Sequence, residues 1–238
     1  MRYFTRESLS FLRALARHNE REWFEANRAR HERFVREPMR ALVEELDVRL
    51  AGIAPEMVGD VRRSPLRARR DTRFTKDKTP YKTFAGCLLF HRDAGRSAAM
   101  RENGGAAGFY FQLEPGGSLV AGGLWAPPRP ALQKVRSAIA EDQEGLERAL
   151  GGAFAQRFGT LYAGSDQMLT RRPRGVAPGH PAEHWLRHLS FVGERALADA
   201  VVTSDALADE LAADLAALTP LVRWLNQVLG YRPARSRY

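Results

Sequence analysis

The pattern of the chain changes between residues 84 and 125, and this change constrains the fold more than any other feature. Residues 84–90, FAGCLLF, form a short continuous apolar run, which is typical of a buried strand. Residues 109–114 and 118–125 flank Pro-Gly-Gly at 115–117, and this arrangement predicts a β-hairpin. The glycine pair at 122–123 indicates either a bulge or a close approach of another backbone. The centre of the chain is therefore expected to form an antiparallel sheet.

Apolar residues recur at helical spacing on both sides of this region. They predict three helices in the first 50 residues or so, a helix after Pro128, and two helices near the C-terminus that end at Gly230. The predicted N-caps are Thr5 and Asn19 for the first two helices, and Ser204 and Thr219 for the last two. A short strand is expected at residues 190–193. We expect a single α+β domain over residues 1–231, in which helices from both ends cover the sheet, followed by a flexible basic tail at 232–238.

Composition excludes several classes of protein. A chain of 238 residues with 44% hydrophobic residues is long enough to bury a core without disulfides or a structural metal. The single cysteine, Cys87, excludes an internal disulfide and predicts a cytoplasmic protein. No run approaches the ~18 apolar residues of a membrane span, and the first 20 residues do not resemble a signal peptide.

Positive charge is concentrated in one segment. The formal net charge is +9, and residues 62–82 alone hold nine cations and two carboxylates. Three of the chain's four lysines also fall in this segment. Pro80 prevents a regular helix there, so the cations cannot spread around a solvated helix surface. Because like charges this dense repel one another, the segment is predicted to bind an external anion.

Residues 70–83, RDTRFTKDKTPYKT, closely resemble the signature of the domain of unknown function 2461 family of bacterial and fungal proteins. Further similarity lies at Phe11-Leu12, Asn19, Trp23-Phe24, Tyr110, Gly122-Gly123, Trp125, Arg136, Pro173, Gly175, His180-Pro181 and Ser190-Phe191. Arg69 departs from the family's pattern, which usually has an aromatic residue there. The resemblance covers nearly the whole chain, and it implies one α+β domain and no established activity.

The basic segment supplies most of the candidate site. The predicted ligand-binding residues are Arg67, Arg70, Thr72, Arg73, Lys76, Lys78 and Lys82, together with Tyr110 and Arg136 from the rest of the resemblance. The predicted catalytic residues are Asp71, Asp77 and Tyr81. Two alternatives stay open: the two aspartates could hold arginine side chains instead of acting as bases, and the whole motif could be an Arg–Asp network that ties an irregular segment to the sheet.

Other chemistry finds little support. The chain lacks the glycine-rich nucleotide-binding signatures and the G-x-S-x-G motif of α/β-hydrolases. His180, His184 and His188 lie four residues apart, but no cysteine is nearby, so we expect no metal site and no cofactor. Cys87 lies within the apolar run and is expected to be an inert thiol.

We therefore expect an uncharacterised protein with a basic cleft for a phosphate- or carboxylate-bearing small molecule, and the sequence leaves open whether it is an enzyme. The alternatives are a nucleic-acid-binding protein, in which Phe74 and Tyr81 stack on bases, and a scaffold for an acidic protein partner. The sequence gives no indication of an oligomeric state.

Overall fold

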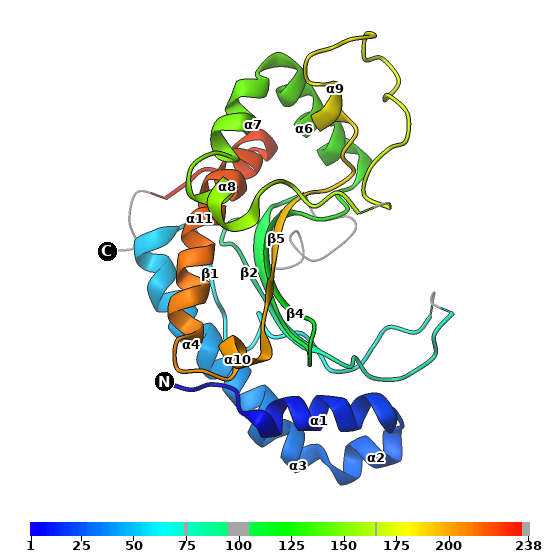
Figure 1. Cartoon of the computed structure of the whole chain (residues 1–238), viewed down its shortest axis with the longest axis vertical. Coiled ribbons are helices and arrows are strands. Elements are labelled where there is room, and N and C mark those ends of the chain that lie inside the picture. The colour runs from blue at the N-terminus through cyan, green and yellow to red at the C-terminus, as the bar shows by residue number, and fades with distance from the viewer. Residues whose placement is uncertain (74–75, 95–104, 165, 235–238) are drawn as a thin grey trace.

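A five-stranded antiparallel sheet forms the centre of the protein (Figure 1). The computed structural model describes residues 1–73, 76–94, 105–164 and 166–234. The strands lie side by side in chain order and are β1 (Met57–Val58), β2 (Ala85–His91), β3 (Gly108–Leu113), β4 (Ser118–Leu124) and β5 (Phe191–Leu197). The strands expected at 84–90, 109–114, 118–125 and 190–193 are confirmed, since each overlaps one of these.

Helices from both ends of the chain pack around the sheet (Figure 1). The N-terminal group is α1 (Arg6–Arg17), α2 (Arg21–Ala26), α3 (Arg28–His31), the π-helical turn η1 (Glu32–Arg36) and α4 (Glu37–Ile53). The C-terminal group is α6 (Arg129–Glu141), α7 (Gln143–Ala149), α8 (Ala153–Phe158), α9 (Glu183–Leu186), α10 (Asp199–Val202) and α11 (Leu207–Leu229). The predicted fold class, a single α+β domain with an antiparallel sheet and flanking helices, is confirmed.

The long helix α11 packs directly against β4 and β5, because glycines leave room for it. A Cβ added at Gly122 or at Gly193 would lie 2.9 Å from a methyl carbon of Leu218 on α11. These two glycines are paired across β4 and β5, and the pairing continues without interruption from Ser118 to Leu124. The glycine pair at 122–123 therefore permits close approach and does not form a bulge.

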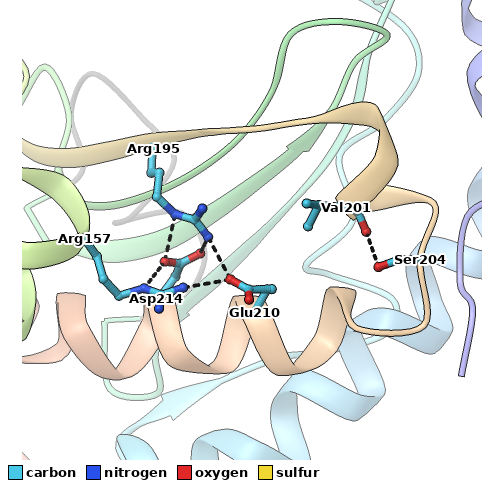
Figure 2. Close-up of polar contacts among 6 residues, drawn as sticks. All are labelled: Arg157, Arg195, Val201, Ser204, Glu210 and Asp214. Carbon is cyan, nitrogen blue, oxygen red and sulfur yellow. Dashed lines mark hydrogen bonds and ion pairs between the residues drawn. The ribbon is translucent and has the colours of Figure 1, made fainter.

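Buried charges hold the same helix to its neighbours (Figure 2). Asp214 of α11 is completely buried and accepts hydrogen bonds from the Nε atoms of Arg157, at 2.6 Å, and Arg195, at 3.0 Å. Glu210, one turn earlier, accepts from Nη2 of Arg157 at 2.9 Å. The four side chains connect α8, β5 and α11 through charge-assisted hydrogen bonds.

Three predicted helix boundaries are wrong. Asn19 does not cap α2, because the Asn19 side chain forms its hydrogen bonds elsewhere, as described below. The N-cap residue of α2 is Glu20. Thr219 does not start a helix: α11 runs through Pro220, and the Thr219 hydroxyl donates to the carbonyl of Leu215 at 2.7 Å. Proline removes one backbone hydrogen bond, and the buried residues on both sides of Pro220 keep the helix continuous. Ser204 donates to the carbonyl of Val201 and is not the N-cap of α11 (Figure 2).

The chain beyond α11 begins to pack against the sheet. Gly230 ends α11 with a left-handed backbone, as predicted. The ring of Tyr231 lies 5.4 Å from that of His91 on β2, and Nε2 of His91 lies 3.0 Å from the carbonyl oxygen of Arg232. Residues 235–238 lie outside the described residues, so the flexible tail at 232–238 and the boundary at 231 stay predictions.

Replacing Asp214 with alanine should lower the free energy of unfolding by about 3 kcal/mol, because two partly buried arginines lose their shared carboxylate. Urea denaturation followed by circular dichroism would measure this loss. Asp205→Ala is the matched control, since Asp205 is mostly exposed and lies 3.6 Å from Arg2; it should cost less than about 1 kcal/mol. Equal losses for the two variants would contradict the structural role given to Asp214.

Candidate functional site

The basic segment folds as a hairpin that extends the β1 side of the sheet. Residues 64–70 run antiparallel to residues 80–88, and backbone hydrogen bonds join Arg70 to Pro80 at 2.9 Å and Lys82 to Ala68 at 2.8 Å. Residues 64–73 and 76–86 are called the basic hairpin below, and residues 71–73 and 76–79 are its tip; Phe74 lies outside the described residues. Figure 1 shows the hairpin projecting away from the strands. Pro80 accepts the Arg70 N–H through its carbonyl oxygen and has no N–H to donate in return.

Asn19 attaches the basic hairpin to the N-terminal helices. Its side-chain amide donates to the carbonyl oxygen of Tyr81 at 2.9 Å, and its side-chain oxygen accepts from the Tyr81 N–H at 3.0 Å. The Tyr81 ring is 2% exposed and stacks on Phe24 of α2, with 4.0 Å between the ring centroids. Tyr81, a predicted catalytic residue, is therefore buried between the hairpin and α2.

The register of the hairpin decides where its arginines lie. Arg69 and Tyr81 form a bridge pair, so their side chains share one face of the hairpin. Arg67, two residues earlier, lies on the same face because side chains alternate along a strand. Since Tyr81 contacts α2 on this face, Arg67 and Arg69 are turned toward the N-terminal helices.

The tip of the hairpin is held by its own aspartates. Arg70 forms an ion pair with Asp77 and donates to the Thr79 hydroxyl at 2.8 Å. Arg73 forms an ion pair with Asp71 at 2.7 Å. These contacts match the alternative in which the aspartates hold arginine side chains.

Hydrogen bonds also lower the pKa of both aspartates. The Arg73 side chain lowers the pKa of Asp71 to about 2. The backbone N–H and hydroxyl of Thr79, and then Arg70, lower the pKa of Asp77 to about 2. A carboxylate with so low a pKa accepts protons poorly at neutral pH, so the predicted role of either as a general base gains no support.

Two lysines of the basic segment bond to backbone carbonyls. Lys78 donates to the carbonyl of Thr72 at 2.8 Å. Lys82 donates to the carbonyls of Arg67 and Arg69 at 2.9 and 3.1 Å, which braces the two strands of the hairpin. Part of the predicted cation set therefore stabilises the hairpin itself. Lys76 is exposed at the tip.

A cavity of about 460 Å³ lies between the base of the hairpin and helices α1 to α4. Its described lining includes seven cations and two carboxylates: Arg28, Arg36, Arg40, Arg62, Arg67, Arg69 and Lys82, with Glu25 and Glu32. The sequence predicted only Arg67 and Lys82 of these cations, because the arginines of α3, η1 and α4 follow a pattern typical of solvated helix surfaces.

The two sides of the cavity differ in how their charges are paired. On the helix side, Arg28 pairs with Glu25 at 3.0 Å, while Arg36 and Arg40 share Glu32 at 2.9 and 3.6 Å. The arginines on the hairpin side are Arg62, Arg67 and Arg69. No carboxylate of the described residues lies within 4.0 Å of any of these three side chains. The excess positive charge therefore lies on the hairpin side.

His31 also lines the cavity, although it is not among the predicted site residues. Its ring lies 5.6 Å from that of Phe11 and 5.1 Å from that of Phe24. Burial lowers the pKa of His31 to about 4, so the imidazole is neutral at pH 7. In the sequence, His31 follows Phe24 by seven residues, and this spacing places Phe24 and His31 near one helical face.

Two predicted ligand-binding residues lie away from the described cavity lining. Tyr110 on β3 donates from its hydroxyl to Oε1 of Gln112 at 2.7 Å, and burial raises its pKa. Arg136 on α6 donates to the carbonyl of His188 at 3.1 Å. The predicted site residues are thus distributed over the cavity, the hairpin tip and these two separate positions.

Neither the histidines nor the cysteine forms a second centre. Nδ1 of His180 accepts the backbone N–H of Ala182 at 3.1 Å, and the rings of His184 and His188 lie 5.6 Å apart. Within the described ranges, no group of three or more His, Cys, Asp or Glu side chains is arranged to hold a metal ion. Burial raises the pKa of Cys87 to about 12, as expected of an inert thiol.

The fold and the cavity define an α+β protein with a basic hairpin docked on N-terminal helices. The model of a family described as conserved hypothetical protein (DUF2461) matches residues 7–224, so the chain belongs to this family. Neither the curated proteins nor the solved structures contain a match. None of the helices in the described part of the chain is long and apolar enough to cross a bilayer.

Replacing Asn19 with alanine should destabilise the protein by about 2 kcal/mol, because the Tyr81 N–H and carbonyl both lose their partner. Hydrogen exchange at the Tyr81 amide should also accelerate, since the base of the hairpin separates from the helices. Asn19→Asp keeps the acceptor and removes the donor, so it should show an intermediate effect. Unchanged exchange at Tyr81 in Asn19→Ala would contradict the attachment described here.

Stability should fall as the pH is lowered from about 6.5 toward 4. Burial lowers the pKa of both His31 and His188 to about 4, whereas the unfolded chain binds these protons near 6.5. Between these values the unfolded state binds more protons, so the free energy of unfolding rises with pH. Urea denaturation at pH 7.5, 6.0 and 5.0 should show a shallower fall for His31→Gln than for the parent protein. Identical slopes would mean that His31 is not kept neutral by the fold.

Proposed function

We propose that the cavity beneath the basic hairpin binds a small molecule that carries a phosphate or carboxylate group. The observation that carries this proposal is the presence of Arg67 and Arg69 on the face turned toward the helices, without a carboxylate of the described residues beside them. Guanidinium groups form paired hydrogen bonds to the oxygens of both kinds of anion. Arg62, at the same side of the cavity, adds a third cation.

The balance of charges favours anion binding in the cavity over anion binding at the tip of the basic hairpin. At the tip, Asp71 and Asp77 already accept hydrogen bonds from Arg73 and Arg70. Seven cations and two carboxylates line the cavity, so an anion would reduce the repulsion among the cations. The cavity volume also falls in the range of small-molecule sites, roughly 300–1,000 Å³.

We propose that the cavity binds a ligand, and we propose no reaction there. Tyr81 remains a predicted catalytic residue because it lines the cavity, although its ring stacks on Phe24. His31 also lines the cavity, and its neutral imidazole can donate and accept hydrogen bonds to a bound ligand. The proposal gives Asp71 and Asp77 the task of positioning the arginines of the tip.

The double variant Arg67→Ala/Arg69→Ala should abolish stabilisation of the protein by anions. Thermal unfolding with inorganic phosphate and with a set of phosphorylated and carboxylated metabolites would find ligands, and calorimetry would give their affinities. We expect a loss of at least tenfold in affinity for any ligand found, because two charge-assisted contacts are removed.

The matched control is Arg171→Ala/Arg172→Ala, which removes the same charge from exposed positions outside the described cavity lining. It should leave the affinity unchanged. Equal losses in both variants would show a general charge effect and overturn the proposal. Binding of RNA or DNA at 50 mM salt that survives Arg67→Ala/Arg69→Ala would favour the nucleic-acid alternative, for which Lys76 and Lys78 are exposed at the tip.

A further inference from the structure

We infer that the ligand of the cavity joins an apolar ring or chain to its anionic group, so that inorganic phosphate alone is a poor ligand. This inference rests on the proposed function and specifies its class of ligand. It depends on the apolar side chains of the cavity lining, whereas the proposed function depends on the charged ones.

Apolar side chains from both sides of the cavity lie beside the arginines. On the helix side Phe24, Val35 and Met39, from α2, η1 and α4, are 6%, 2% and 2% exposed and form the closed floor of the cavity. On the opposite side, Val61 is 37% exposed and Pro65 and Leu66 are half-buried, so these side chains offer apolar surface to a ligand. A molecule whose anionic group pairs with Arg67 and Arg69 would therefore place its remaining atoms against apolar surface.

Phe84 adds apolar surface from an irregular part of the hairpin. The backbone pairs Leu66 with Gly86 and Ala68 with Lys82, so residues 83–85 stand opposite Arg67 alone and form a bulge. Phe84 lies in this bulge, lines the cavity and is half-buried. It is not among the described side chains that pack against the hydrophobic core.

The size of the cavity also favours an organic anion. A volume of about 460 Å³ corresponds to roughly 15 water molecules at about 30 Å³ each. A phosphate ion, with five heavy atoms, would fill a small part of it and would leave the apolar lining in contact with water. An attached ring would cover that lining and gain hydrophobic free energy. His31, which is neutral and has its ring tilted against that of Phe24, adds no competing charge.

Calorimetry with three probes of similar charge would test the inference: phenyl phosphate, sn-glycerol 3-phosphate and inorganic phosphate. We expect phenyl phosphate to bind at least tenfold more tightly than the other two. We also expect Phe84→Ala to lower the affinity for phenyl phosphate severalfold and to leave the affinity for inorganic phosphate unchanged. Val48→Ala is the matched control, because Val48 is 68% exposed on α4 and outside the described lining; it should change neither affinity.

The outcomes separate this inference from the proposed function. If the three probes bind equally and all depend on Arg67 and Arg69, the apolar specificity is wrong and anion binding stands. If no probe binds, or if benzyl alcohol binds as tightly as phenyl phosphate, both proposals are wrong. An effect of Phe84→Ala on inorganic phosphate as large as that on phenyl phosphate would also overturn the inference, because it would indicate a general disturbance of the hairpin.

Discussion

The contact between α11 and the sheet is the packing on which the rest of the structure depends. Gly122 and Gly193 bring the backbones of β4 and β5 within reach of Leu218, and the buried Asp214 then ties the same helix to α8 and β5. Helices α1 to α3 lie at one end of the molecule (Figure 1). There they meet the basic hairpin, and the cavity lies between the two.

Local signals in the sequence predicted the sheet well. The Pro-Gly-Gly turn and the apolar run at 84–90 depend on neighbouring residues, so β2, β3 and β4 could be placed from the sequence. The errors at Asn19 and Thr219 have a different origin. Asn19 bonds to Tyr81, which is 62 positions away, and α11 continues past Thr219 because packing outweighs the helix-breaking tendency of Pro220. Neither effect can be read from adjacent residues.

The candidate site was predictable only in part, for reasons of charge pairing. Repulsion within the basic segment suggested an external anion, but Arg70 and Arg73 find carboxylates inside the tip. The sequence could not show which cations remain unpaired, since that depends on the register of the hairpin. It also could not show that Arg36 and Arg40 of the N-terminal helices face the same cavity, because only the fold brings those helices to the hairpin.

The anchoring of the basic hairpin through backbone atoms has a consequence for how the family could diversify. Asn19 recognises the peptide groups of Tyr81 and makes no use of the side chains at positions 67 and 69. Under the proposed function, attachment of the hairpin and recognition of the ligand would be carried by different atoms. Substitutions at positions 67 and 69 would then change ligand recognition and leave the backbone hydrogen bonds that fasten the hairpin in place.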